Sequence, residues 1–243
     1  MSLEGKVALI TGSSSGIGRA IAERLAQDGA SVIINYVKSP QKAQSVVRTI
    51  EGKGAKAMAI QADVSNVNDI RRLFQASLQH FGRMDFVIAN SGMFNQQSLM
   101  ETTEEDYDAM FALNAKGAFF TLQEAGKHLQ DGGRVIFISS GATAMSYPGA
   151  AAYKGSKAAG EQFVKTLAKE LGPRQITVNT VSPGFTETEM LPSDPAFRKT
   201  GINMSPLGRL GQPEDIADVV SFLISEEGGW ITGNTIQAGG GII

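Results

Sequence analysis

The stretch KVALITGSSSGIGRAIAERLAQDGASVIINY (residues 6–36) decides the fold. It begins with a short β-branched run, turns through Gly12, Gly16 and Gly18, continues with helical periodicity and ends in a second β-branched run. Strand, glycine turn, helix and strand in this order are typical of a parallel sheet covered by helices. The first N–H groups of such a helix, at its positive end, can hold a pyrophosphate. The alternative interpretation is an ordinary glycine-rich connection.

The same alternation continues along the chain. Further strands are predicted at residues 55–61, 84–90, 133–140, 176–182 and 233–238, which brings the total to seven. We therefore expect an α/β fold in which a doubly wound parallel sheet carries helices on both faces. Without repeats or linkers, residues 1–243 are expected to form a single domain. The segment 184–212, rich in Pro, Gly and Met, is longer than a usual connection and is predicted to be a lid-like insertion.

Composition excludes several classes of function. The net charge of −2, with 19% charged residues, lacks the basic excess of a nucleic-acid or anionic-membrane binder. The chain has no cysteine and two isolated histidines, His80 and His128, so we expect neither a metal site nor a Ser/His triad. Both histidines are expected on helix surfaces. No apolar run reaches the length of a signal core or a membrane span, so a cytoplasmic protein is expected.

A tyrosine and a lysine stand out in GAAAYKGSKAAGEQFVKTLAKEL (residues 149–171). On a helix, Lys157 lies about 40° from Tyr153, within the same apolar stripe as Val164 and Leu171. The other lysines of this stretch point away: Lys154, Lys165 and Lys169. A lysine on the buried side of a helix indicates a role inside the protein.

These motifs together resemble the short-chain dehydrogenase/reductase family. The resemblance rests on TGxxxGxG after the first strand, Asn90 and Gly92 after the fourth, the Tyr153/Lys157 pair, and SPGF after the sixth strand, and it covers essentially the whole chain. It implies a Rossmann-like, seven-stranded parallel sheet and an oxidoreductase. Within the family the chain is similar to 3-oxoacyl-[acyl-carrier-protein] reductases and polyhydroxynaphthalene-type ketoreductases. Ala89 replaces the first asparagine of the usual NNAG, which resembles reductases of aromatic polyketides and some sugar or polyol dehydrogenases.

The resemblance implies four catalytic residues: Asn114, Ser140, Tyr153 and Lys157. Tyr153 would transfer the proton, and because a free tyrosine has a pKa of about 10, the Lys157 ammonium would stabilise its phenolate. Ser140 would hold the substrate oxygen, and Asn114 would support a water chain. Ser139 is the weaker serine candidate, because adjacent strand residues face opposite ways and only Ser140 keeps the family distance to Tyr153.

The cofactor implied is NADP(H). Asn35 occupies the position where an acid would disfavour a 2′-phosphate, and Lys38 and Ser39 follow closely. Asp63 matches the residue that binds the adenine ring in the family. The cofactor contacts implied by the resemblance, besides Tyr153 and Lys157, are Gly12, Ser14, Ser15, Gly16, Ile17, Gly18, Asn35, Tyr36, Lys38, Ser39, Asp63, Val64, Asn90, Ser91, Gly92, Pro183, Gly184, Thr186 and Thr188.

The expected reaction interconverts a ketone and a secondary alcohol. One alternative is a 3-oxoacyl-[acyl-carrier-protein] reductase; another is a non-enzymatic NADP(H)-binding regulator, against which the intact catalytic set argues. A free, mostly apolar ketone is favoured over a carrier-bound chain. In KHLQDGGR (residues 127–134), where an acidic carrier would dock, Asp131 opposes the carrier's charge, and Arg174 is the only other obvious anchor. The expected substrate pocket comprises Phe94, Met145, Tyr147, Phe185, Met190 and Leu191. Tyr147 has Ala151 four residues further on and therefore lacks a neighbouring cation, so it is predicted to form a wall of the pocket.

We also expect a homo-oligomer, a tetramer as in similar reductases. Helices predicted at 104–130 and 151–171 would pair with symmetry mates, and the apolar tail ending in Ile242 and Ile243 would meet its own copy.

Overall fold

The computed structural model describes residues 2–243 and contains one seven-stranded parallel sheet in the order β3-β2-β1-β4-β5-β6-β7. The strands are β1 (Val7–Ile10), β2 (Ser31–Tyr36), β3 (Ala57–Gln61), β4 (Phe86–Ala89), β5 (Arg134–Ile138), β6 (Thr177–Pro183) and β7 (Thr235–Ala238). All seven strands predicted from the sequence are present. Strand order reverses between β1 and β4, which is where such sheets bind ligands, at the carboxyl ends of the strands.

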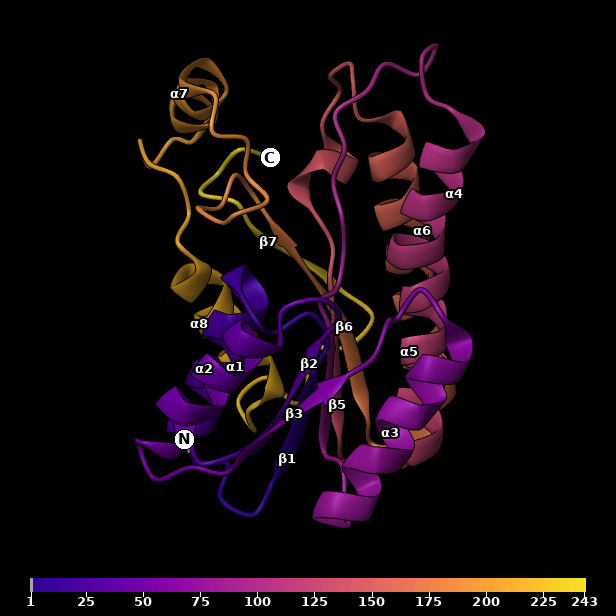
Figure 1. Ribbon diagram of the computed structural model, residues 1–243, viewed down its shortest axis with the longest axis vertical. Helices are drawn as coiled ribbons and strands as arrows, with labels where there is room; N and C mark the ends of the chain where they lie inside the picture. Colours follow the sequence, from indigo (N-terminus) through magenta and orange to yellow (C-terminus); the bar gives the residue numbers. More distant parts are fainter. Residues whose placement is uncertain (1) are drawn as a thin grey trace.

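Helices cover both faces of the sheet, as predicted for a doubly wound Rossmann-like fold (Figure 1). On one face lie α1 (Gly16–Gln27), α2 (Pro40–Glu51) and α8 (Pro213–Ile224). On the other lie α3 (Val67–Phe81), α4 (Glu104–Phe111), α5 (Ala118–His128) and α6 (Ala151–Leu171). No helix within residues 2–243 is both long enough and apolar enough to cross a bilayer.

The sheet is buried on both sides because successive strand residues enter different cores. In β1, Ala8 and Ile10 pack with the α1, α2 and α8 side, whereas Val7 and Leu9 pack with the opposite side. A strand of this kind therefore reads as a continuous apolar run.

Helix α6 begins and ends where the sequence predicts, and its buried stripe includes Tyr153, Lys157 and Val164. It lies very close to β5: a Cβ added at Gly160 would be 2.3 Å from the Phe137 ring. Glycine at this position lets the helix that carries Tyr153 and Lys157 sit directly on the sheet.

The continuous helix predicted at 104–130 is wrong. A π-helical segment, η1 (Ala112–Gly117), separates α4 from α5, and α5 ends at His128. One wider turn accommodates an extra residue and often marks a functional site. Gly117 closes this turn against the loop after β3, since a Cβ there would lie 2.5 Å from the Val64 carbonyl oxygen.

The 184–212 segment contains α7 (Pro195–Met204) and is joined to the sheet at a narrow base. There the Glu187 amide donates to the Gly211 carbonyl at 2.8 Å, and the Gly211 amide donates to the Phe185 carbonyl at 2.9 Å. Short 3₁₀ turns complete the chain at η2 (Gly141–Ala144) and η3 (Gly172–Arg174). Of the two histidines, His80 is exposed on α3, and His128 lies 3.2 Å from Glu124 on α5.

Candidate active site

A cavity of about 470 Å³ opens at the carboxyl ends of the strands. It is bounded by the glycine turn after β1, the ends of β2, β4, β5 and β6, the first turns of α6, and the 184–212 segment. Ser140, Tyr153 and Lys157 all line it, so the structure brings together three of the four predicted catalytic residues in one cavity.

The glycine turn leaves no room for side chains at its floor. Gly12 and Gly16 have φ angles of +62° and +55°, a region that favours glycine. A Cβ at Gly18 would lie 2.5 Å from both Asn90 Nδ2 and the Gly12 carbonyl oxygen. The N-cap of α1, Ser15, makes no side-chain capping bond, so the first amides of α1 keep their capacity to bind an anion. These features fit a dinucleotide pyrophosphate.

The end of β4 is fastened to this turn. Thr11 Oγ1 accepts hydrogen bonds from the amides of Asn90 and Ser91, both at 3.0 Å, and Asn90 Nδ2 donates to the Thr11 carbonyl at 2.9 Å. Gly92 follows beside Lys157 and Asn114: a Cβ there would lie 2.9 Å from Lys157 Nζ and 3.2 Å from Asn114 Oδ1. The floor of the cavity is therefore one bonded unit built from the ends of β1 and β4.

Tyr153 points into the cavity from the first turn of α6 and is 9% exposed. The Phe94 ring packs against it edge to face, with ring centres 5.0 Å apart. Burial raises the pKa of Tyr153, and a hydrogen bond with the Ser140 side chain opposes this rise to a smaller extent. At neutral pH the phenol is therefore protonated and can act as a proton donor.

Lys157 lies one helical turn further along α6 and is 4% exposed. Its Nζ donates to the Ile138 carbonyl at the end of β5, at 2.9 Å. Burial lowers the pKa of Lys157 to about 8. The predicted placement of a lysine inside the protein is confirmed, and the group still carries a positive charge at pH 7.

Asn114 lies in the π-helical segment and is completely buried. Its Oδ1 accepts from the Met93 amide and its Nδ2 donates to the Met93 carbonyl, both at 2.9 Å. Nδ2 also lies 3.1 Å from Ser156 Oγ, which in turn donates to the Tyr153 carbonyl at 2.8 Å. The side chain joins the segment after β4 to α6 and does not line the cavity; its expected part in a water chain stays a prediction.

The two serines at the end of β5 make different contacts. Ser140 Oγ accepts from the Ala142 amide at 3.2 Å, which caps η2 and holds the hydroxyl in place. Ser139 Oγ donates to Glu161 Oε1 at 2.6 Å, which occupies its proton. This difference supports Ser140 as the serine with a hydroxyl proton available to a ligand.

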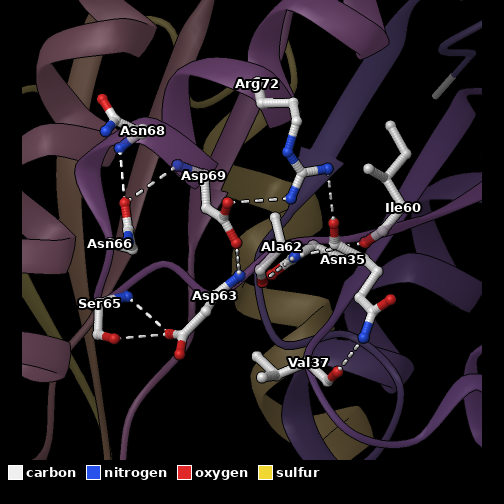
Figure 2. Close-up of polar contacts among 11 residues, drawn as sticks. Asn35, Val37, Ile60, Ala62, Asp63, Ser65, Asn66, Asn68, Asp69 and Arg72 are labelled. Atoms are coloured by element: carbon white, nitrogen blue, oxygen red, sulfur yellow. Dashed lines mark hydrogen bonds and ion pairs between the residues drawn. The ribbon is translucent and has the colours of Figure 1, made fainter.

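The prediction that Asn35 faces the cofactor is wrong. Asn35 is completely buried, and its Oδ1 accepts from the Gly12 amide at 3.1 Å. Its Nδ2 donates to the Ala62 carbonyl at 2.9 Å (Figure 2). It supports the glycine turn from below and does not line the cavity. Strand alternation places the next residue, Tyr36, at the cavity instead, followed by Val37 and Lys38.

Asp63 also lies outside the cavity lining. Its carboxylate accepts from the Ser65 amide at 2.9 Å and the Ser65 hydroxyl at 2.7 Å, and its own amide donates to Asp69 (Figure 2). It borders an adjacent depression with Arg72, whereas Val64 lines the main cavity. Its predicted contact with an adenine ring stays a prediction.

Most other predicted site residues line this cavity. From the expected cofactor set these are Gly12, Ser14, Ser15, Gly16, Ile17, Gly18, Tyr36, Lys38, Ser39, Val64, Asn90, Ser91, Gly92, Pro183, Gly184, Thr186 and Thr188. All six expected substrate-pocket residues also line it: Phe94, Met145, Tyr147, Phe185, Met190 and Leu191. Sequence reasoning missed Phe197, whose ring meets that of Phe185 at 5.5 Å; its position inside the 184–212 segment was the available signal.

Tyr147 has a neighbouring cation that the sequence spacing did not reveal. Lys154 Nζ lies 5.2 Å from the centre of the Tyr147 ring and donates to the Met145 carbonyl. Burial raises the pKa of Tyr147, and the proximity of Tyr153 raises it further. Tyr147 is thus a protonated, fixed aromatic wall beside Tyr153.

Comparisons with known proteins agree with this geometry. A family model described as enoyl-(acyl carrier protein) reductase matches residues 12–242. The chain is 44% identical to hydroxynaphthalene reductase-like protein Arp2 of Metarhizium majus, over 100% of this chain and 96% of that protein. A short chain dehydrogenase from Burkholderia cenocepacia in complex with NADP has a TM-score of 0.96 and 40% identity, covering 100% of this chain and 99% of that one. The angucycline C-6 ketoreductase LanV with bound NADP has a TM-score of 0.95 and 40% identity, covering 99% and 96%.

Proposed function

The chain belongs to the short-chain dehydrogenase/reductase family of oxidoreductases, and from this premise we propose that it interconverts a ketone and a secondary alcohol with NADP(H). The observation that carries the proposal is that Ser140, Tyr153 and Lys157 meet in one cavity with an open glycine turn. Bound NADPH would supply the hydride, and the residues of the chain would do the rest.

Two helix ends would hold the cofactor. The uncapped amides of α1 would bind its pyrophosphate. Ser39, the N-cap of α2, makes no side-chain capping bond, and with the exposed Lys38 it offers a donor and a cation for a 2′-phosphate. Lys157 would bind the nicotinamide ribose. The two relatives of known structure described above hold NADP, which supports this choice over NAD.

Proton transfer would run through Tyr153. In reduction, its phenol donates a proton to the carbonyl oxygen as that oxygen gains charge, while the Ser140 hydroxyl donates a hydrogen bond to the same oxygen. The Lys157 ammonium stabilises the phenolate that is left, so its positive charge inside the protein has a chemical purpose. In alcohol oxidation the same groups act in reverse.

The substrate we propose is a free, mostly apolar ketone. Phe94, Tyr147, Phe185 and Phe197 line the cavity, which favours a cyclic or aromatic compound. Relatives named as a hydroxynaphthalene reductase-like protein and an angucycline ketoreductase support the same class.

A carrier-bound substrate finds less support on the surface. Arg174, the expected anchor for an acidic carrier, donates to Asp131 at 2.7 Å and to the Gly126 carbonyl at 2.6 Å. The Asp131 carboxylate therefore offsets the charge of Arg174, and the guanidinium Nε and Nη1 already have partners, which leaves less of the side chain to bind an acidic carrier. The 3-oxoacyl-[acyl-carrier-protein] reductase stays the alternative within the enzyme class, and an NADP(H)-binding regulator is the alternative outside it.

The test is NADPH consumption with a panel of substrates. We expect cyclic or aromatic ketones to give a higher kcat/KM than a 3-oxoacyl chain, whether on its carrier or on a small thioester. Tyr153→Phe should lower kcat at least about 100-fold while leaving the Kd for NADPH within a few-fold, because it removes only the proton donor. NADPH binding without any ketone reduction would favour the regulator. A preference for the carrier-borne chain that salt and Arg174→Glu both weaken would favour the alternative reductase.

We also propose that the protein is a homotetramer. Large apolar side chains are exposed on two separate faces: Tyr107 and Phe119 on α4 and α5, and Phe222 and Trp230 on and after α8. Exposed apolar groups gathered in this way are typical of interfaces between subunits.

A further inference from the structure

Glu161 lies on α6, eight residues beyond Tyr153 and four beyond Lys157, but it does not line the cavity. It faces the end of β5. There Glu161 Oε1 accepts a hydrogen bond from Ser139 Oγ at 2.6 Å and another from Thr143 Oγ1 at 2.8 Å. A single carboxylate oxygen thus binds two hydroxyl groups from one short segment.

These two hydroxyl groups stand on either side of Ser140. The Thr143 amide donates to the Ser140 carbonyl at 3.1 Å, and the Thr143 hydroxyl lies 3.0 Å from that carbonyl, so its one proton is shared between this oxygen and Glu161. The Ala142 amide holds Ser140 Oγ. Glu161 therefore joins both flanks of the catalytic serine to the helix that carries the tyrosine.

Among the residues that the structure describes, these two hydroxyl groups are the only hydrogen-bond partners of the Glu161 carboxylate. Within residues 2–243 no Lys, Arg or His nitrogen lies within 4.0 Å of Glu161. Ser139 is 4% exposed, so its hydroxyl needs a partner inside the protein, and Glu161 provides it.

We propose that Glu161 is a positioning residue for Ser140, setting the separation between the end of β5 and the catalytic face of α6. The proposal rests on the proposed function, in which Ser140 and Tyr153 bind the same substrate oxygen. Two donors on different elements can converge on one atom only if their separation is fixed, and a displacement of about 1 Å can cost about 100-fold in rate. Because Glu161 touches neither cavity nor cofactor site, its effect should be confined to catalysis.

Three variants test this. Glu161→Leu removes both acceptor contacts, Glu161→Gln keeps an acceptor oxygen of the same reach, and Glu170→Leu removes an exposed glutamate from the same helix as a matched control. We expect Glu161→Leu to lower kcat at least about tenfold, with the Kd for NADPH within about threefold of wild type. Glu161→Gln and Glu170→Leu should stay within about threefold of wild-type kcat.

A double-mutant cycle shows whether Glu161 acts through Ser140. After Ser140→Ala, the further change Glu161→Leu should reduce kcat by less than about twofold, because the group being positioned is gone. If the two losses multiply, Glu161 acts elsewhere and the proposal is overturned.

Hydrogen exchange gives a readout that needs no substrate. Glu161→Leu should speed exchange at the Ala142 and Thr143 amides at least about tenfold, and Glu161→Gln should not. Should Glu161→Leu not fold, Ser139→Ala with Thr143→Val removes the same two contacts and should reproduce both effects.

Wild-type protein that reduces no ketone contradicts the proposed function, whereas unchanged exchange in the folded variants contradicts the role of Glu161 alone. The role of Glu161 would also be overturned if the wild type is active, the Ser140→Ala variant has a low kcat and the Glu161→Leu variant keeps the wild-type kcat.

Discussion

At the scale of single residues, the buried Lys157 lines the cavity at a cost in stability. Burial lowers its pKa from 10.5 to about 8, so between these values the unfolded chain binds a proton that the native protein does not. The free energy of unfolding therefore rises with pH across this window. Below pH 8 the whole cost is present, and it is of the order of 3 kcal/mol.

Replacing this charge should stabilise the protein while abolishing its activity. We expect Lys157→Met to raise the free energy of unfolding at pH 7 by about 1–3 kcal/mol, less than the full cost because the hydrogen bond to the Ile138 carbonyl is lost. The gain should shrink between pH 8 and pH 10.5. Urea unfolding at pH 7 and pH 9.5 measures both values, and a variant less stable than wild type at pH 7 would contradict the argument.

Introducing a carboxylate at the end of β2 should have different effects at two adjacent positions. At position 36 it should change the preference between NADPH and NADH, and at position 35 it should lower the free energy of unfolding. Tyr36→Asp places the charge in the cavity beside Lys38 and Ser39, where it repels a 2′-phosphate. We expect the NADPH-to-NADH ratio of kcat/KM to fall at least about tenfold, which needs about 1.4 kcal/mol. Asn35→Asp instead loses the donor to the Ala62 carbonyl inside the protein, and should cost about 1–3 kcal/mol of unfolding free energy.

Steady-state kinetics with both cofactors, combined with urea unfolding of each variant, separates the two effects. A stable Asn35→Asp protein with switched preference would show that Asn35 does face the cofactor. The sequence predicted Tyr36, Lys38 and Ser39 as cofactor contacts along with Asn35, but it assigned the position of the acid to Asn35 because family spacing was counted without the alternation of the strand. Tyr36 and Asn35 point to opposite sides of the sheet.

At the scale of elements, the π-helical segment supports the site through Asn114. We expect deletion of the exposed Lys116 to let α4 and α5 join as one regular α-helix, which would turn Asn114 away from Met93. Helical circular dichroism should change little, whereas kcat should fall at least about tenfold. Lys116→Ala is the control and should keep its activity within about twofold. A fully active deletion variant would rule out this role for the wide turn.

Periodicity predicted the strands and α6 but not this interruption. The spacing of apolar residues along the sequence is almost the same for an α-helix with one wide turn as for a regular α-helix, because only six residues depart from the α pattern. The wide turn depends on contacts from distant parts of the chain, namely Met93, Ser156 and Val64. The same limit applies to Glu161, whose partners lie 18 and 22 residues away in sequence.

At the scale of the whole molecule, the proposed tetramer predicts the behaviour of the only tryptophan. Trp230 is 99% exposed in the isolated chain, so its emission should be red-shifted in a monomer and blue-shifted when a second copy covers it. Light scattering at micromolar concentration should give a mass of about 103 kDa, four times the 25.7 kDa of the chain. Trp230→Phe leaves an apolar ring and serves as the control for assembly. A mass near 25.7 kDa with red-shifted emission would exclude the oligomer.

The narrow base of the 184–212 segment also bears on how such an enzyme could acquire a new substrate. Two backbone hydrogen bonds, from the Glu187 amide to the Gly211 carbonyl and from the Gly211 amide to the Phe185 carbonyl, bring the two ends of this segment together. A recombination event that exchanges residues 189–209 would therefore replace Met190, Leu191 and Phe197 in one step and keep Thr188 and every strand. Substrate choice can then diverge through exchange of one contiguous segment, while the glycine turn and α6 are inherited unchanged.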